Sequence, residues 1–273
     1  GNVVVNNTDN LLISSFVGVV SAGIYSNYYL LIGSVRQVLD QALQGVAASV
    51  GNLGVTEDKE KISDVFEQLF FVGYWMYGLA GIYLFELLNP FVELAFGEKY
   101  LFQRKIVLIL CINFFINGMR KSVLIFKESM GLFWYDRYKA LAEAVLNLGI
   151  SIVLVKNFGV WGVFAGTFCS TVLTSVWVEP YILYKYRFHR PVKEYFKTYA
   201  GYLLMMVAAW SLTEGSCQFI RGGILAQLFL RGLVCLGVPN LLLWLIFRRT
   251  EKWKRLSGLL KRIGKKVKKS LRR

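Results

Sequence analysis

Long apolar stretches dominate this chain, and most are long enough for a membrane-spanning helix. A hydrocarbon core of roughly 30 Å needs about 20 apolar helical residues. Within a few residues at each end, eight stretches cover 2–20, 22–50, 65–96, 102–126, 138–155, 159–184, 198–216 and 223–247. They are continuous rather than alternating, which favours helices over barrel strands. We therefore predict an all-α fold, a polytopic membrane helix bundle with about eight transmembrane helices.

The composition and the placement of charge agree with this pattern. The 273 residues are 55% hydrophobic and 18% charged, whereas a soluble domain carries about 25% charge. The net charge of +15 is not spread over the chain, because 25 of the 32 basic residues lie in 52–63, 120–139, 185–197 and beyond 247. The positive-inside rule predicts that these segments and the C-terminus are cytoplasmic. We expect no nucleic-acid partner.

The second apolar segment has one polar face. At about 100° per residue, Arg36, Gln37, Asp40, Gln41 and Gln44 fall within an arc of about 140°, opposite an apolar arc. Ionisable groups inside a membrane segment are costly, so they mark cavities or pathways. We predict that this face lines a substrate-binding cavity. The alternative is that Arg36 and Asp40, at i and i+4, form an ion pair with a structural role only.

The first segment carries Asp9 and Asn10 about midway along its length. An unpaired carboxylate there would be costly, so a basic or hydrogen-bonding partner is expected, and Arg36 is one candidate. We include both residues in the predicted substrate site. The alternative is a polar kink without a ligand.

Further polar positions lie on later segments. Asn113, Asn117 and Arg120 share one face of the fourth segment, and Glu143 and Asn147 lie on the fifth. For these residues we favour hydrogen bonds between helices and an interfacial arginine over substrate binding.

Enzyme and metal motifs are missing from the sequence. There is no GxSxG, GxxxxGK[ST], HExxH or CxxC pattern, and the only histidine, His189, stands in a basic loop. The spacing of the four cysteines indicates neither a zinc site nor a disulfide framework, so we interpret them as packing residues. We expect no catalytic residues, no bound metal and no cofactor.

The last residues, 250–273, interleave apolar side chains with Lys and Arg. This pattern is typical of an amphipathic helix on anionic membrane lipids, although a disordered basic tail fits equally well.

Several short motifs appear in order along the segments. They are Thr8-Asp9-Asn10-Leu11-Leu12-Ile13-Ser14, Gly23-Ile24-Tyr25-Ser26-Asn27-Tyr28, Gly51-Asn52-Leu53, Asn89-Pro90-Phe91, Gly97-Glu98-Lys99-Tyr100, Gly131-Leu132-Phe133-Trp134 and Gly159-Val160-Trp161-Gly162-Val163. Their order and spacing resemble the second half of bacterial polysaccharide (O-antigen) flippases, in the multidrug/oligosaccharidyl-lipid/polysaccharide exporter superfamily.

The resemblance implies a transporter of undecaprenyl-diphosphate-linked oligosaccharide repeat units, which works by alternating access in the bacterial cytoplasmic membrane for capsule, O-antigen or exopolysaccharide synthesis. Residues 1–185 would form the second six-helix lobe, 186–247 two additional transmembrane helices and 248–273 a basic amphipathic cytoplasmic tail. The partners would be the lipid-linked substrate and an N-terminal lobe that this chain lacks.

Two alternatives remain open. A cation-coupled multidrug exporter of the same superfamily would need an acidic cavity around Asp9 and Asp40. A membrane-embedded polysaccharide polymerase or glycosyltransferase would need a carboxylate cluster or a large loop, and the longest internal loop predicted has only about a dozen residues.

Overall fold

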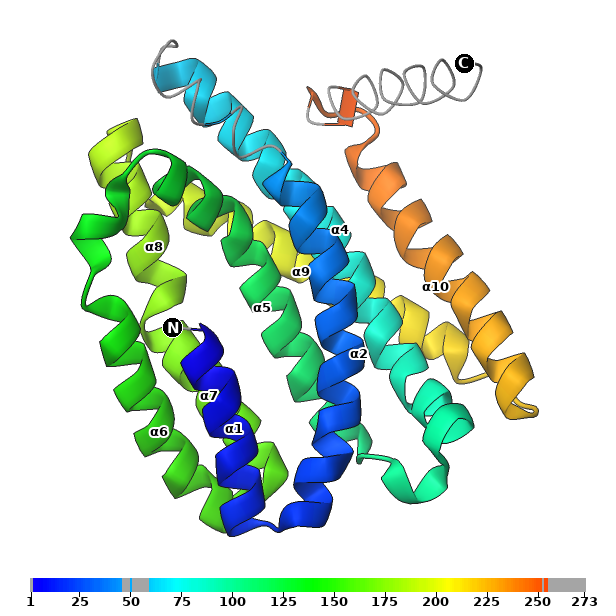
Figure 1. The fold of residues 1–273 in the computed structure, drawn as a ribbon. Helices are drawn as coiled ribbons and strands as arrows, with labels where there is room; N and C mark the ends of the chain where they lie inside the picture. Colours follow the sequence, from blue (N-terminus) through cyan, green and yellow to red (C-terminus); the bar gives the residue numbers. More distant parts are fainter. Residues whose placement is uncertain (1, 46–49, 51–58, 252, 255–273) are drawn as a thin grey trace, which may run out of the picture.

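The computed structural model describes residues 2–45, 50, 59–251 and 253–254, and within this part of the chain every regular element is helical. The long helices are α1 (Asn2–Phe16), α2 (Val19–Gln44), α4 (Lys59–Phe96), α5 (Arg104–Ser129), α6 (Lys139–Phe158), α7 (Val160–Leu173), α8 (Ser175–Leu183), α9 (Lys193–Cys217) and α10 (Ile224–Phe247). Three short helices, η1 (Glu98–Tyr100), η2 (Leu132–Asp136) and the π-helical η3 (Tyr184–Phe188), complete the fold (Figure 1). The all-α prediction is confirmed.

Five helical stretches in the described residues are long and apolar enough to cross a membrane. They are Glu60–Phe96, Arg104–Ser129, Leu132–Phe158, Val160–Phe188 and Ile224–Phe247. This is the pattern of a multi-pass membrane protein. α1 has only 15 residues, and α2 carries the polar face described above. The predicted count of about eight spanning helices therefore stays a prediction.

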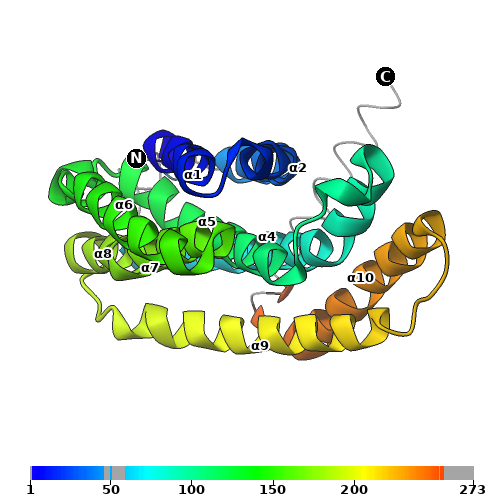
Figure 2. The same ribbon diagram turned by 90° about the horizontal axis from the view of Figure 1, so that it is seen from below.

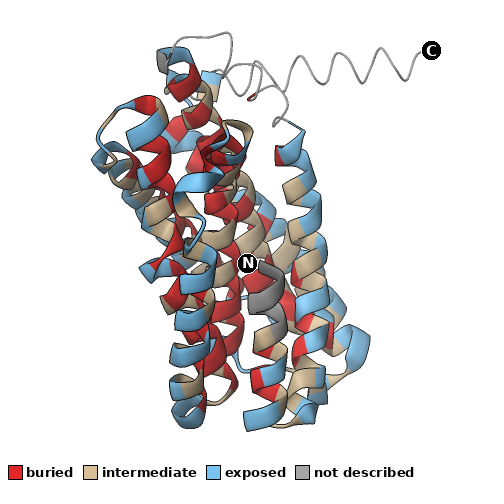
Figure 3. Cartoon of the chain, turned by 60° about the vertical axis from the view of Figure 1, so that its left-hand side comes forward, coloured by how far each residue is buried: buried red, intermediate tan, exposed pale blue. Residues whose placement is uncertain are grey.

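The helices are arranged in layers. Figure 2 shows α1 and α2 on one side of the row formed by α4, α5, α7 and α8, and α9 on the other side. α1 packs on α6 and α7, α2 packs on α4 and α5, and α9 and α10 pack on α4 and on each other. Buried residues face the spaces between these layers, and exposed apolar residues face outward (Figure 3).

Several helix ends lie together at one end of the bundle. The C-terminal ends of α2, α5, α8 and α10 and the start of α4 lie at the upper end in Figure 1. The segments that the sequence predicts to be cytoplasmic all adjoin this end. Residues 52–58 and the tail beyond 254, including the predicted amphipathic helix, lie outside the described residues.

One helix boundary follows the sequence prediction, and one predicted stretch is divided in the structure. Gly18 separates α1 from α2. Its φ of 123° would be strained in any residue with a side chain, so the position favours glycine. The predicted segment 159–184 is divided at Thr174, whose hydroxyl donates to the Ser170 carbonyl at 2.6 Å. A threonine hydroxyl that bonds the preceding turn bends a helix.

A buried hydrogen-bond triangle fixes α2 against α4 at the lower end. The Tyr28 hydroxyl donates to Asn89 Oδ1 at 2.6 Å and accepts from the Phe102 N–H at 3.0 Å. Asn89 Nδ2 in turn donates to the Phe102 carbonyl at 3.0 Å. The triangle satisfies polar groups that would otherwise be buried unpaired. Asn89, the residue before Pro90, therefore has a structural role.

α6 and α7 approach each other closely at glycines. A Cβ built on Gly162 would overlap the Leu154 carbonyl group, which belongs to the backbone and cannot rotate away. Gly166 would meet Ser151 in the same way. Both glycines therefore allow the close packing of α6 and α7.

We expect Gly162→Ala to lower the free energy of unfolding by about 1–3 kcal/mol, because overpacking forces the two backbones apart. Gly149→Ala on the exposed side of α6 is the matched control, since a Cβ there meets nothing within 4 Å. Thermal unfolding of the purified protein in detergent measures both. Equal melting temperatures for the two variants would contradict the packing argument.

Candidate functional site

A cavity of about 490 Å³ lies between the α1–α2 layer and the helices behind it. Its wall includes Asp9 from α1, residues of α2 from Tyr25 to Gln44, Tyr77 from α4, residues of α5 from Leu110 to Leu124, Glu143 from α6 and Phe164, Thr167 and Thr171 from α7. Six helices therefore contribute to one site.

Six of the seven predicted site residues lie on this wall. They are Asp9, Arg36, Gln37, Asp40, Gln41 and Gln44. Asn10 does not line the cavity, and its side-chain oxygen is buried without a hydrogen-bond partner in the described chain. It follows Asp9 by one residue, and neighbouring residues on a helix point in directions about 100° apart.

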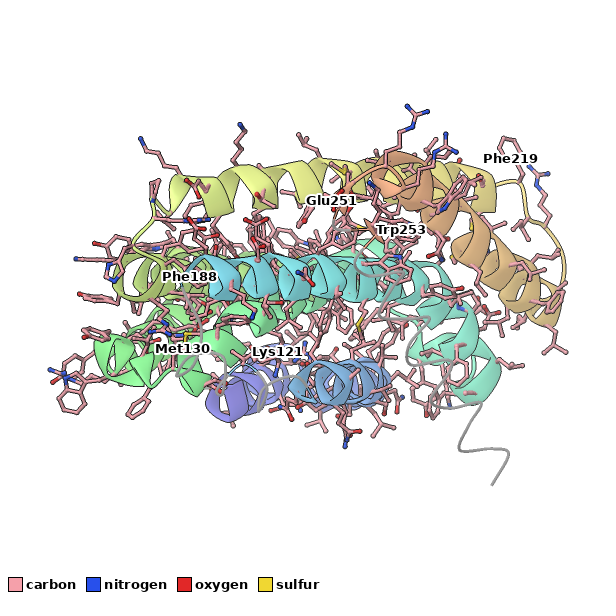
Figure 4. All side chains as sticks on the ribbon, turned by 90° about the horizontal axis from the view of Figure 1, so that it is seen from above. Lys121, Met130, Phe188, Phe219, Glu251 and Trp253 are labelled. Atoms are coloured by element: carbon pink, nitrogen blue, oxygen red, sulfur yellow. The ribbon has the colours of Figure 1, made fainter. Side chains whose placement is uncertain are left out.

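Asp40 does not pair with Arg36, so the alternative of a structural i,i+4 ion pair between them is wrong. Its carboxylate instead accepts from Lys121 Nζ at 2.7 Å and from the Tyr77 hydroxyl. Figure 4 shows Lys121 on the side of α5 that faces α1 and α2. Donors on two neighbouring helices reach Asp40 across the interface, and the carboxylate ties α2 to α4 and α5.

Sequence reasoning missed Lys121 because it counted 120–139 with the cytoplasmic loop, although the predicted fourth segment itself extends to 126. α5 continues to Ser129, which leaves Lys121 well inside the helix. The available signal was position: Lys121 follows Asn117 by four residues and so lies on the same face.

Arg36 has no carboxylate within ion-pair distance in the described part of the chain. Its guanidinium lies 6.0 Å from the centre of the Phe114 ring, a cation–π contact. It also interacts electrostatically with the hydroxyl groups of Tyr25 and Tyr77. The arginine therefore lines the cavity without a direct ion pair to any acidic side chain that the structure describes.

Asp9 is only 3% exposed and lies at the α7 side of the cavity. It accepts a hydrogen bond of 3.1 Å from the Thr167 hydroxyl, which itself accepts from Asn147 Nδ2 at 2.9 Å. The suggested Arg36 partner is not within ion-pair distance. The amide oxygen of Asn147, Oδ1, is buried and makes no hydrogen bond among the described residues.

Arg120 is the centre of a buried ionic cluster beside the cavity. It binds the Glu179 carboxylate with two hydrogen bonds of 2.8 and 3.0 Å, and it lies 3.8 Å from Glu143. Lys139 also donates to Glu179, and Lys127 donates to Asp136. The three basic and three acidic groups of this cluster balance each other. The predicted hydrogen bonds between helices are confirmed for Glu143, which accepts from Thr171 at 3.0 Å and from Ser175 at 2.7 Å. Arg120 was predicted to be an interfacial arginine, but it is buried. Both residues also line the cavity.

A second ionic cluster lies at the lower end, away from the cavity. Glu86 on α4 is 1% exposed and pairs with Arg104 at 3.3 Å and with Arg231 of α10 at 3.6 Å. Arg104 also binds Glu214 of α9 at 2.5 Å. The arginine inside the last apolar segment is thus paired, and the cluster joins α9 and α10 to α4.

No group of three or more His, Cys, Asp or Glu side chains that could hold a metal ion occurs among the described residues. Cys111, Cys217 and Cys235 are buried and all four cysteines are free.

These features define the class as a helical, multi-pass membrane protein with a charged cavity between its helices. Comparisons with protein-family models, curated proteins and solved structures give no match.

We expect Glu179→Gln to lower the stability of the protein by about 3–5 kcal/mol, because it leaves two buried cations facing a neutral amide. Glu128→Gln is the matched control, since Glu128 is exposed on α5. Thermal unfolding in detergent compares them. A second substitution, Lys139→Gln, removes one of the two cations that pair with Glu179 and should recover part of the loss. A Glu179→Gln protein as stable as the control would contradict the role of the cluster.

Proposed function

We propose that this chain carries the anionic headgroup of a lipid-linked oligosaccharide across a membrane, as the resemblance to polysaccharide flippases implies. The observation that supports it best is the charge distribution of the cavity. The basic residues on its wall are Arg36, Arg120 and Lys121. Arg120 and Lys121 are held by carboxylates, and only Arg36 has none within ion-pair distance in the described chain.

An unpaired guanidinium between membrane helices is costly unless a ligand or water compensates it. A diphosphate is a suitable ligand, because guanidinium binds phosphate oxygens with paired hydrogen bonds. Arg36 is therefore the residue that we assign to the diphosphate group.

The neighbouring amides suit the sugar part of such a substrate. Gln37, Gln41 and Gln44 are exposed on the same face of α2 as Arg36. An amide both donates and accepts hydrogen bonds, which matches the hydroxyl groups of a saccharide. The cavity volume of about 490 Å³ lies within the range of roughly 300–1,000 Å³ that is usual for small-molecule sites.

The mechanism that we propose is alternating access. The polar headgroup would occupy the cavity. The lipid chain would stay in the hydrocarbon region, so its apolar surface would never be exposed to water. Movement of the helices against a second lobe would then expose the cavity to the opposite side. The bacterial cytoplasmic membrane and the cytoplasmic C-terminus remain part of this proposal.

We expect Arg36→Ala, introduced into the native gene, to reduce surface polysaccharide by at least tenfold, because removing a charged hydrogen-bonding group costs about 1.5–3 kcal/mol. Glycan staining of whole cells measures the product, and immunoblotting of membranes measures the protein. Arg36→Lys should retain part of the activity, since it keeps the charge and loses the paired geometry.

The matched control is Arg221→Ala, because Arg221 is exposed in the α9–α10 connection and far along the chain from the cavity residues. Normal polysaccharide in the Arg36→Ala strain at normal protein levels would refute the assignment.

Asp9 favours a second candidate function, a cation-coupled exporter of the same superfamily. Its carboxylate is buried and no basic residue of the described chain lies within ion-pair distance, so a proton or a small cation is a suitable partner. We expect Asp9→Asn to abolish drug tolerance in a strain that depends on this gene, if drug export is the activity. Unchanged drug susceptibility in the gene deletion, with altered surface glycan, would exclude this candidate and leave the flippase proposal standing.

A further inference from the structure

Two short segments meet at the upper end of the bundle. One consists of η2 with Arg137 and Tyr138, and the other runs from Tyr181 through η3. The rings of Tyr135 and Tyr186 stack at 3.9 Å between centroids, with 18° between their planes. Figure 4 shows Met130, which precedes η2, and Phe188, the last residue of η3, on the same side of the bundle. We call the surface of residues 133–138, 181, 185 and 186 the aromatic face.

The aromatic rings of this face are exposed. Phe133, Trp134, Tyr135 and Tyr138 are 64%, 63%, 52% and 69% exposed, respectively. Four large exposed rings within six residues gather apolar surface in one place, and such a concentration marks an interaction surface.

Basic side chains lie on these rings. The Arg137 guanidinium lies 4.3 Å from the centre of the Trp134 ring and 4.8 Å from that of Tyr138. Lys185 Nζ lies 5.3 Å from the rings of both Tyr181 and Tyr186. Cation–π contacts of this kind hold the charged ends at the surface.

The aromatic face has no free acidic group. Within 132–139 and 181–188 the only acidic residue is Asp136, and its carboxylate binds Lys127 and Lys139 in the buried cluster below. That cluster holds η2 in place while leaving the outer surface positive. The face is therefore aromatic and cationic.

We propose that the aromatic face binds the headgroups of anionic phospholipids in the adjoining membrane leaflet. Its residues stand at the ends of two candidate membrane spans, Leu132–Phe158 and Val160–Phe188. Tyr and Trp rings prefer this depth, between hydrocarbon and water. Lys and Arg beside them attract anionic headgroups. The inference does not depend on the cavity or on the transported substrate.

The test uses the full chain in lipid nanodiscs that contain photoactivatable phosphatidylglycerol, with crosslinks mapped by mass spectrometry. We expect crosslinks in 132–139 and 181–187. Each basic residue near the surface is worth about a fivefold change in anionic lipid binding, so Arg137→Gln/Lys185→Gln should lower this yield by roughly thirtyfold at limiting lipid. Crosslinks to the basic tail serve as an internal reference and should not change.

The matched control is Lys156→Gln/Arg221→Gln, which removes the same charge from exposed positions elsewhere. Trp134→Leu/Tyr138→Leu is a second variant that removes the rings under Arg137 and keeps the charge, and it should lower the yield by severalfold. This variant decides the matter if the first one fails to fold.

Three results would overturn the proposal. The first is an equal yield in the wild-type chain and both variants of the face. The second is an equal yield from photoactivatable phosphatidylcholine, which would indicate mere proximity to lipid. The third is full competition by soluble glycerol phosphate at millimolar concentration, which would indicate a site for free phosphate esters instead of a membrane surface.

Discussion

The pair of Arg120 and Glu179 holds together the part of the bundle on which the cavity depends. Both side chains are buried, and the guanidinium meets the carboxylate through two hydrogen bonds across α5 and α8. In a low-dielectric interior such a pair is stable only if its remaining hydrogen-bonding groups are satisfied. Here Asn117 accepts from Arg120 at 2.8 Å, and Lys139 supplies a further donor to Glu179.

The position of this pair orients α5. The same helix directs Asn113, Asn117 and Lys121 toward the cavity, and Lys121 in turn holds Asp40 of α2. The ionic cluster also connects to η2 through Lys139 and Asp136, so it supports the aromatic face at the end of the bundle. One buried set of charges thus positions two different surfaces.

Spacing within one helix was enough to predict which side chains of α2 share a face. The polar face of α2 follows from spacing alone, and its five residues all line the cavity. Partners on other helices could not be predicted, because the angular positions of residues around one helix do not show which helices pack together. For that reason Lys121 was not recognised as the partner of Asp40, and the hydrogen bond from Thr167 to Asp9 could not be predicted. The division at Thr174 was also missed, because no glycine stands at the break in this apolar run; a hydrogen bond from the Thr174 hydroxyl to the preceding turn accompanies it.

Among the charged residues that line the cavity, Arg36 and Asp9 have no ion-pair partner within the described part of the chain, and their charges are opposite. Arg36 and Asp9 both interact electrostatically with the hydroxyl of Tyr25, which lies on the same wall. An anion bound at Arg36 would cancel the positive charge that acts on Asp9, and this would favour a proton or cation at Asp9. By linkage, a cation at Asp9 would strengthen anion binding at Arg36 by the same factor. The charge distribution that supports a carrier of anionic headgroups therefore also supplies a physical route for coupling that carrier to a cation.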